Sequence, residues 1–280
     1  MKLILGSAQW GLNYGISNYN GKPKRREVEE IISLADKKNI YFVDTAYLYG
    51  DSEKRVGSLC SSKFKIITKI NPSRNELSIK KLVDMSLKRL DRKKVYGCLF
   101  HNVNFLIDNP QLWSELLIEK GKGKIDKIGC SFYEPNELEE ILSLNILPDI
   151  VQIPFSILDR KFEKYFSELK RKKIEIHVRS VFLQGLYFLD INSLSKKFIS
   201  VKGPLIQIEK LCKENSINKL DLCLAYVCNN SFVDYIIIGV QNKDQLNQVI
   251  QSKIKLSKAL LKEISAIQIN QKKMLNPTQW

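Results

Sequence analysis

Four polar residues of different chemistry follow short apolar segments in the first 101 residues: Asp44, Tyr49, Lys69 and His101. The segments are IYFVD, FKIITK and VYGCLFH, and each of them ends in a polar side chain. If they are parallel strands of one barrel, their carboxyl ends lie on the face where barrel active sites are built. A carboxylate keeps a neighbouring ammonium charged, and that ammonium lowers the pKa of a neighbouring phenol, which makes the phenol a better proton donor. We therefore expect a single pocket for proton transfer.

The elements that must position these residues recur along the whole chain. Eight segments rich in β-forming residues alternate with amphipathic segments, and the ends of the second to seventh lie 22 to 31 residues apart. The predicted strands are 3–8, 40–44, 64–69, 95–100, 125–131, 149–153, 174–179 and 234–239. The predicted helices are 26–39, 52–60, 78–92, 111–121, 136–145, 161–173, a two-part helix at 204–229, and 243–251.

Eight alternating strand and helix units predict an α/β fold, a closed (β/α)8 TIM barrel with a C-terminal helix at 256–268 and a tail. No linker or low-complexity tract divides the chain, so residues 1–280 are predicted to form one domain. The long gap before the last strand leaves room for a loop at about 183–203 that folds over the mouth of the barrel.

The net charge of +15 comes from 45 lysine and arginine residues that are dispersed and interleaved with acids. A nucleic-acid surface would require a basic stripe with interleaved aromatic residues, which the sequence lacks. We therefore interpret the charge as solvated helix faces and predict no nucleic-acid partner. The sequence shows no coiled-coil seam, so it predicts no particular oligomeric state.

Six cysteines form no CxxC pair and lie mostly in apolar segments, which is typical of reduced thiols in the cytoplasm. With only two histidines the chain offers no zinc-ligand spacing, so no metal is predicted. The N-terminus lacks the apolar region of a signal peptide, and no apolar run is long enough to span a bilayer. These features predict a soluble cytoplasmic protein with no membrane partner.

The segment FVDTAYLYGDSEKRVG resembles the signature of the aldo-keto reductase family, and ITKI and LFHN follow it at suitable distances. The resemblance extends to KGKIDKIGCSFYEPNEL, DIVQIPFSILDR and DYIIIGVQNKDQLNQVI, and so it covers nearly the whole chain. It implies an NAD(P)H-dependent oxidoreductase that reduces a small-molecule aldehyde or ketone. Tyr49 would be the general acid. Lys69 would lower the pKa of Tyr49, Asp44 would keep Lys69 charged, and His101 would orient the carbonyl oxygen.

Taken singly, each of these residues has an ordinary structural interpretation. Asp44 could be a helix cap or turn residue, Tyr49 a packing aromatic, Lys69 a surface lysine and His101 a hydrogen-bonded loop histidine. The functional interpretation depends on the full set, with its members spread over successive predicted strands and within the DTAxxYGxSE context.

The resemblance also implies a nicotinamide dinucleotide bound without a GxGxxG loop, and the chain has none at a strand-to-helix junction. Ser131 and Gln152 match the positions that hold the carboxamide, Arg179 the position that stacks on the nicotinamide ring, and Ser180 the pyrophosphate side. The remaining expected cofactor contacts lie at the end of the eighth predicted strand and after it: Gly239, Gln241, Lys243, Gln245 and Gln248.

Three positions depart from the family pattern. Phe132 replaces the asparagine of an SN pair, and Gln245 and Val249 replace an arginine and an asparagine that grip the adenosine end. Lys243 could substitute as a point charge, so we favour NADPH, with NADH as the alternative. The same segment also reads as an ordinary capped helix, with Asn242 as N-cap and Gln245 completing a capping box.

Trp10, Phe132 and Phe155 are predicted walls of the substrate pocket, with core packing as the alternative for each. LGSAQWGLNYGI and VRSVFLQGL resemble bacterial members associated with surface-polysaccharide sugar pathways, which suggests a keto or aldehydo sugar as substrate. Two other functions stay open at this point. The chain could be a cofactor-binding regulatory or partner subunit, or a sugar-processing enzyme that uses a retained nicotinamide without net redox change.

Overall fold

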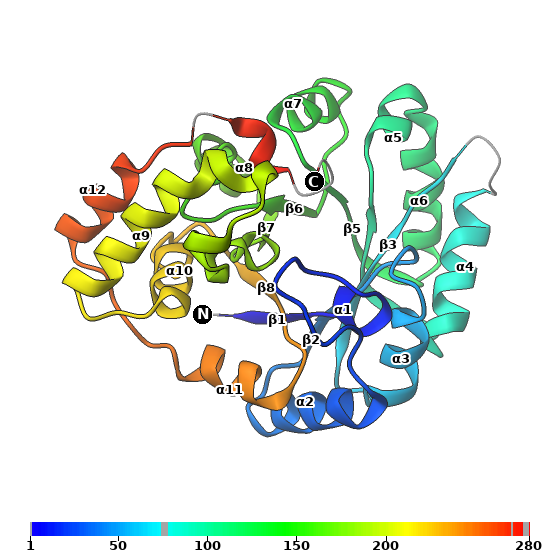
Figure 1. Ribbon diagram of the computed structural model, residues 1–280. Coiled ribbons are helices and arrows are strands. Elements are labelled where there is room, and N and C mark those ends of the chain that lie inside the picture. The colour runs from blue at the N-terminus through cyan, green and yellow to red at the C-terminus, as the bar shows by residue number, and fades with distance from the viewer. Residues whose placement is uncertain (1, 74–77, 270, 277–279) are drawn as a thin grey trace.

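The structure is a computed structural model that describes residues 2–73, 78–269, 271–276 and 280 (Figure 1).

Eight parallel strands form a closed barrel in chain order, each paired with the next and β8 paired with β1. The (β/α)8 barrel predicted from the sequence is confirmed. The strands are β1 Leu3–Gly6, β2 Phe42–Asp44, β3 Lys65–Ile70, β4 Val95–Phe100, β5 Ile125–Ser131, β6 Ile150–Pro154, β7 Glu175–Arg179 and β8 Tyr235–Gly239.

Helices surround the barrel on its outside (Figure 1). The longer ones are α2 Arg25–Lys37, α3 Ser52–Leu59, α4 Ile79–Leu90, α6 Gln111–Gly121, α7 Pro135–Ser143, α8 Phe166–Arg171, α9 Lys202–Glu214, α10 Lys219–Cys228, α11 Lys243–Gln251 and α12 Lys258–Ala266. Two short helices, α1 Ala8–Gly11 and α5 Asn104–Asp108, follow β1 and β4. The 3-10 turns are η1 Glu163–Tyr165, η2 Leu183–Phe188, η3 Ile191–Ser193, η4 Lys196–Val201 and η5 Lys272–Leu275.

The interior of the barrel is filled by side chains. Ile4, Ile67, Leu99, Ile150 and Ile237 form a buried cluster that is separate from the larger core between barrel and helices. A barrel of eight strands has an interior just wide enough for such side chains. Ligands can therefore reach the barrel only at its mouth, where the strands end.

The helices pack on the barrel through apolar faces. In α2 the buried residues are Val28, Ile31, Ile32, Leu34 and Ala35, whose spacing follows the helical repeat. These positions face the barrel, and the charged residues between them face solvent. The amphipathic patterns in the sequence therefore predict the outer layer correctly.

Two segments differ from the prediction. The predicted helix at 161–173 is divided into η1 and the shorter α8, and the region 183–203 forms three 3-10 turns. Leu183, Gln184 and Gly185 have positive φ angles of 44°, 55° and 96°, which interrupt a regular helix there. Among the described residues, no helix is long and apolar enough to cross a membrane.

Candidate active site

Asp44 and Lys69 form a buried ion pair at the ends of β2 and β3. The Lys69 Nζ lies 2.6 Å from the Asp44 Oδ2, and the two side chains are 1% and 4% exposed. Lys69 also donates to the Thr45 carbonyl at 3.0 Å, and Gln152 Nε2 donates to Asp44 Oδ1 at 2.8 Å. Both carboxylate oxygens of Asp44 are therefore engaged, and the ammonium has a fixed direction.

Tyr49 and His101 lie next to this pair. The Lys69 Nζ is 3.5 Å from the Tyr49 hydroxyl, and the rings of Tyr49 and His101 are perpendicular with centroids 5.4 Å apart. The Nδ1 atom of His101 is buried and has no hydrogen-bond partner among the described residues. The structure thus brings together all four residues that the sequence singled out.

A network of buried hydroxyl groups positions the loop that carries Tyr49. Ser52 Oγ donates to the Ser7 carbonyl at 2.9 Å, and Ser7 Oγ donates to the Asp44 carbonyl at 2.8 Å. A Cβ atom on Gly50, whose φ is 58°, would lie 2.5 Å from the carbonyl oxygen of Gly11. The β1 and β2 loops are therefore packed backbone against backbone, which fixes the position of Tyr49.

The pKa of Tyr49 does not follow the expectation from the sequence. Burial raises the pKa of Tyr49 well above its ordinary value, and the Asp44 carboxylate raises it further, while Arg179 opposes them. Desolvation, which disfavours the phenolate, therefore outweighs the lowering of the pKa expected from Lys69. The phenol is protonated at neutral pH, as a proton donor must be.

The other two ionisable groups are also shifted by burial. Burial lowers the pKa of His101 to about 3, with further lowering by Lys69 and Arg179, so its imidazole is neutral at pH 7. Burial also lowers the pKa of Lys69, an effect that the Asp44 carboxylate opposes. A neutral imidazole can still donate one hydrogen bond to a substrate oxygen.

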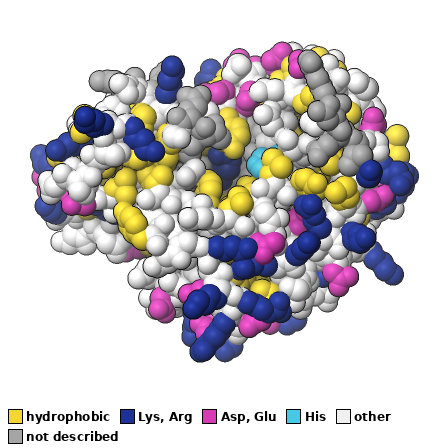
Figure 2. Space-filling view, turned by 45° about the vertical axis from the view of Figure 1, so that its right-hand side comes forward, with side chains coloured by type: hydrophobic (Ala, Val, Ile, Leu, Met, Phe, Trp, Pro, Cys, Tyr) yellow, Lys and Arg dark blue, Asp and Glu magenta, His cyan; other side chains and the backbone are white. Residues whose placement is uncertain are grey.

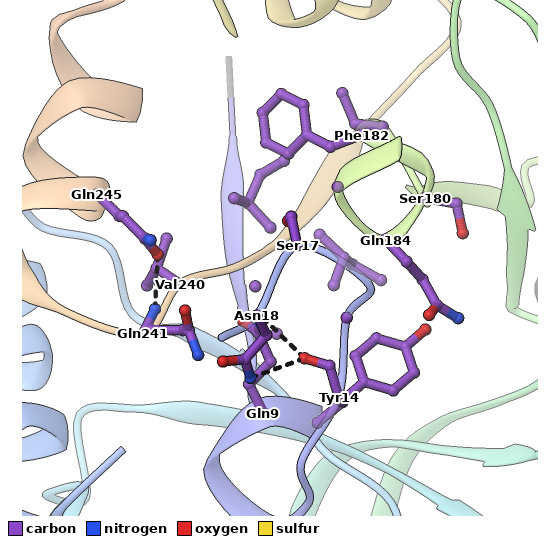
Figure 3. Close-up of a pocket in the computed structure, with 18 of the residues that line it drawn as sticks. Gln9, Tyr14, Ser17, Asn18, Ser180, Phe182, Gln184, Val240, Gln241 and Gln245 are labelled. Carbon is purple, nitrogen blue, oxygen red and sulfur yellow. Dashed lines mark hydrogen bonds between the residues drawn. The ribbon is translucent and has the colours of Figure 1, made fainter. Parts of the chain in front are cut away.

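A cavity of about 490 Å³ opens beside Asp44 and Tyr49 and extends to the segment after β8. Figure 2 shows the hollow in the surface, and Figure 3 shows side chains that line it. The predicted cofactor residues on its wall are Gln152, Arg179, Ser180, Gly239, Gln241, Gln245 and Gln248. Ser131 is buried and Lys243 is exposed, and neither is part of the lining.

The three predicted aromatic walls lie elsewhere. Trp10, Phe132 and Phe155 are at most 1% exposed and are not part of the cavity lining. Trp10 donates its indole N–H to the Val240 carbonyl at 3.1 Å, and Phe155 packs edge-on against Phe166 at 5.2 Å. The pocket-wall expectation is corrected to core packing, because these rings fill the space between barrel and helices.

The sequence analysis missed lining residues that follow β1 and β7. Tyr14 and Gln184 extend toward one another in Figure 3, and Gln9 lies on the same wall. The Ile16 N–H donates to the Gln184 carbonyl at 3.0 Å, which joins the two loops. Their position after strand ends was the available signal, since such loops share one face of a barrel.

The family model for aldo/keto reductases matches residues 2–269. The chain belongs to the aldo/keto reductase family. An uncharacterized oxidoreductase of Schizosaccharomyces pombe is 27% identical over 221 residues, which cover 75% of this chain and 78% of the yeast protein. This aldo/keto reductase is accordingly an oxidoreductase that acts on carbonyl compounds.

Solved structures of family members share the fold. An aldo-keto reductase from Bacillus halodurans in its holo form has a TM-score of 0.73 at 20% identity and covers 95% of this chain and 91% of its own. A glycerol dehydrogenase from Gluconobacter oxydans also has a TM-score of 0.73 at 20% identity, with 95% and 90% covered. At this identity the likeness shows the barrel alone.

Aldo/keto reductases generally use nicotinamide cofactors, and the residues on the cavity wall fit such a group. The buried Gln9 Oε1 has no hydrogen-bond partner among the described residues, and it would lie 3.0 Å from a Cβ on Gly239. Asn242 caps α11 through the Gln245 N–H at 2.9 Å, and Gln245 Oε1 accepts from the Gln241 N–H at 2.8 Å. The expected N-cap is confirmed. In a capping box Gln245 would accept from the N–H of the N-cap residue Asn242, but here it accepts from the N–H of the preceding residue, Gln241.

Asp159 gives this aldo/keto reductase a testable dependence of stability on pH. Its side chain is fully buried, neither carboxylate oxygen has a hydrogen-bond partner among the described side chains, and Lys161 Nζ is 3.8 Å away. Burial raises the pKa of Asp159 to about 6. Because the pKa of Asp159 is higher in the folded than in the unfolded chain, its protonated form stabilises the fold relative to its ionised form. The contribution of Asp159 to the free energy of unfolding is fully present below about pH 4 and is lost as the pH rises through 6.

We expect Asp159→Asn to stabilise the protein at pH 8 by up to about 3 kcal/mol and to have little effect at pH 4. Urea unfolding at the two pH values measures the difference. Asp126→Asn, at a more exposed ion pair, is the control and should show no such pH dependence. An equal change at both pH values would contradict the assignment.

Proposed function

We propose that this protein reduces an aldehyde or ketone with NAD(P)H and that Tyr49 delivers the proton to the carbonyl oxygen. The proposal rests on two contacts of the Lys69 ammonium. It donates to the Asp44 carboxylate at 2.6 Å, and it lies 3.5 Å from the Tyr49 hydroxyl. The proposal treats residues 1–280 as one catalytic domain.

The nicotinamide, when bound, supplies the hydride that adds to the carbonyl carbon. The oxygen then gains negative charge, which the Tyr49 hydroxyl neutralises by giving up its proton. The Lys69 ammonium stabilises the phenolate that remains, and the Asp44 carboxylate keeps that ammonium charged and in place. His101, neutral and at the side of the Tyr49 ring, donates a hydrogen bond to the same oxygen.

The residues proposed to hold the cofactor divide into two groups. Gln152, which bonds to Asp44, and its strand neighbour Ser131 would hold the carboxamide, while Arg179 would stack on the nicotinamide ring and Ser180 would contact the pyrophosphate. Gln241, Gln245 and Gln248 lie toward the start of α11 and would contact the adenosine end. We favour NADPH, with the exposed Lys243 at the start of α11 as the cation that would bind a 2′-phosphate, and we place the reaction in the cytoplasm.

Titration with NADPH and with NADH tests the proposal without a known substrate. Trp10 is a suitable reporter because its indole bonds to Val240, a residue of the lining. We expect quenching of tryptophan fluorescence, with tighter binding of NADPH, followed by oxidation of the bound cofactor on addition of sugar aldehydes or ketones. The Trp10→Phe variant is the control for the signal. Failure of both nucleotides to bind would overturn the proposal.

A further inference from the structure

Glu53 is a buried carboxylate in the first turn of α3, the helix that begins three residues after Tyr49. Its side chain is 1% exposed, and its Oε1 accepts a hydrogen bond from the Thr68 hydroxyl at 2.7 Å. Its Oε2 has no hydrogen-bond partner among the described residues and lies 3.6 Å from the Arg89 Nη1. A buried ion pair contributes little net stability compared with apolar side chains of the same volume. The groups that this pair holds are therefore the guide to its role.

Thr68 connects Glu53 to the strand that carries Lys69. Thr68 directly precedes Lys69 in β3, and successive side chains of a strand point to opposite faces. Thr68 therefore faces the helices outside the barrel, where Glu53 accepts its hydrogen bond, while Lys69 points into the site. This bond fixes the start of α3, and with it the end of the loop that carries Tyr49, relative to Lys69.

Arg89, near the end of α4, contacts the loop that carries Tyr49 directly. Its Nη1 donates to the Tyr47 carbonyl at 3.3 Å, and its guanidinium carbon lies 4.0 Å from the centre of the Tyr47 ring. The Tyr47 N–H donates to the Lys69 carbonyl at 3.0 Å. A planar guanidinium can stack on a ring and donate to an oxygen at the same time, which an ammonium cannot do. Tyr47 is thus held between Arg89 and β3, two residues before Tyr49.

The helices that carry Glu53 and Arg89 pack closely against each other (Figure 1). A Cβ atom on Gly57 of α3 would lie 2.5 Å from the carbonyl oxygen of Leu90 in α4. No side chain separates the two backbones at this point, so the distance spanned by the ion pair is fixed. Neither Glu53 nor Arg89 is part of the cavity lining. Any effect of the pair on the reaction therefore passes through the two residues that it contacts, in β3 and in the loop.

We propose that Glu53 and Arg89 are positioning residues that set the distance between the Tyr49 hydroxyl and the Lys69 ammonium. The inference rests on the proposed function, because it concerns the proton transfer from Tyr49. That distance is 3.5 Å, and the attraction between the ammonium and the phenolate left by proton transfer falls as the distance grows. A displacement of about 1 Å in an active site can lower the rate about 100-fold. Substitutions of the pair should therefore act on the chemical step.

Arg89→Met should lower kcat for the reduction of D-glyceraldehyde by about 10- to 100-fold, with KM and the affinity for NADPH near their wild-type values. The reason is that the cavity wall stays intact while the Tyr49 hydroxyl moves. Arg89→Lys keeps a cation beside Glu53 but lacks the guanidinium plane, so it should restore part of kcat. Stopped-flow measurement of NADPH oxidation gives the rate of the chemical step, and the fluorescence titration gives the affinity for NADPH.

The reverse reaction gives a readout that a loss of stability alone would not change. Oxidation of glycerol by NADP+ transfers a hydride to the nicotinamide and a proton to the Tyr49 phenolate, which must form first. A phenolate further from Lys69 is less stabilised, so the apparent pKa in the pH profile of kcat should rise in Arg89→Met. A lowered kcat with an unchanged pH profile would contradict the positioning role.

Glu119 provides a matched control at the opposite end of the barrel. Its side chain is 2% exposed and pairs with Lys124, which is 24% exposed and directly precedes β5, whereas Glu53 and Arg89 are 1% and 28% exposed. Glu119→Gln should lower the free energy of unfolding and leave kcat unchanged. The double variant Glu53→Gln with Arg89→Met removes the carboxylate that would lack a cation, so it should recover stability but not kcat. Recovery of kcat in the double variant would overturn the proposal.

Crystal structures of the wild-type protein and of Arg89→Met separate this proposal from the proposed function, because they require no substrate. We expect the Tyr49 hydroxyl to lie further from the Lys69 Nζ in the variant. An unchanged distance would overturn the proposal even if D-glyceraldehyde is reduced. If the wild-type protein reduces no carbonyl compound, the proposed function fails, and the change in this distance still decides whether Arg89 positions Tyr49.

Discussion

Tyr49→Phe should lower kcat for carbonyl reduction by about 100- to 10,000-fold and leave the affinity for NADPH unchanged. The substitution removes the hydroxyl that lies 3.5 Å from Lys69 and keeps the ring that packs against His101. Stopped-flow measurement of NADPH oxidation separates the chemical step from binding, which the fluorescence titration measures.

A matched control is Tyr47→Phe, which removes a hydroxyl from the same loop at a ring that lies 4.0 Å from the Arg89 guanidinium. We expect near-normal kcat for that variant. Substantial turnover in Tyr49→Phe would show that another group gives the proton, and the assignment would have to be abandoned.

Lys69→Met should destabilise the fold by about 3–5 kcal/mol and also abolish reduction. The cause is Asp44, which would stay buried with only Gln152 and no cation to compensate its charge. The free energy of unfolding in urea measures the effect.

The double variant Asp44→Asn with Lys69→Met should recover much of that stability, because it also removes the buried carboxylate that would lack a cation. It should not recover activity. Lys80→Met breaks the exposed pair with Asp84 and should change stability little. If Lys69→Met lowered the free energy of unfolding only slightly, the prediction would be wrong. Water or protonation of Asp44 would then compensate the missing cation.

The barrel and the four clustered residues could be predicted from the sequence because strand ends in a barrel share one face. Asp44 and Lys69 lie within or at the end of short strands, so their meeting follows from adjacent strands in register. The pKa of Tyr49 could not be predicted, because it depends on the amount of burial as well as on the nearest charge.

The directions of the side chains at the site could not be predicted from the sequence either. Arg179 reaches back across β6 to Phe132, and Trp10 points into the core toward Val240. Such directions depend on loops whose packing involves residues far apart in the chain. The burial of Asp159 could not be predicted for the same reason.

The cavity wall combines residues from the two ends of the barrel sequence. Gly6, Ala8 and Gln9 line it together with Val240 and Gln241, and bonds join the two ends of the chain there: Trp10 donates to the Val240 carbonyl, 230 residues later, and Gln241 donates to the Gly21 carbonyl at 3.0 Å. Because β1 closes the barrel only by pairing with β8, the wall is incomplete until the last strand has been added. A chain without β8 therefore lacks that side of the wall, and a gain of affinity for the proposed cofactor would report that β8 has joined the barrel.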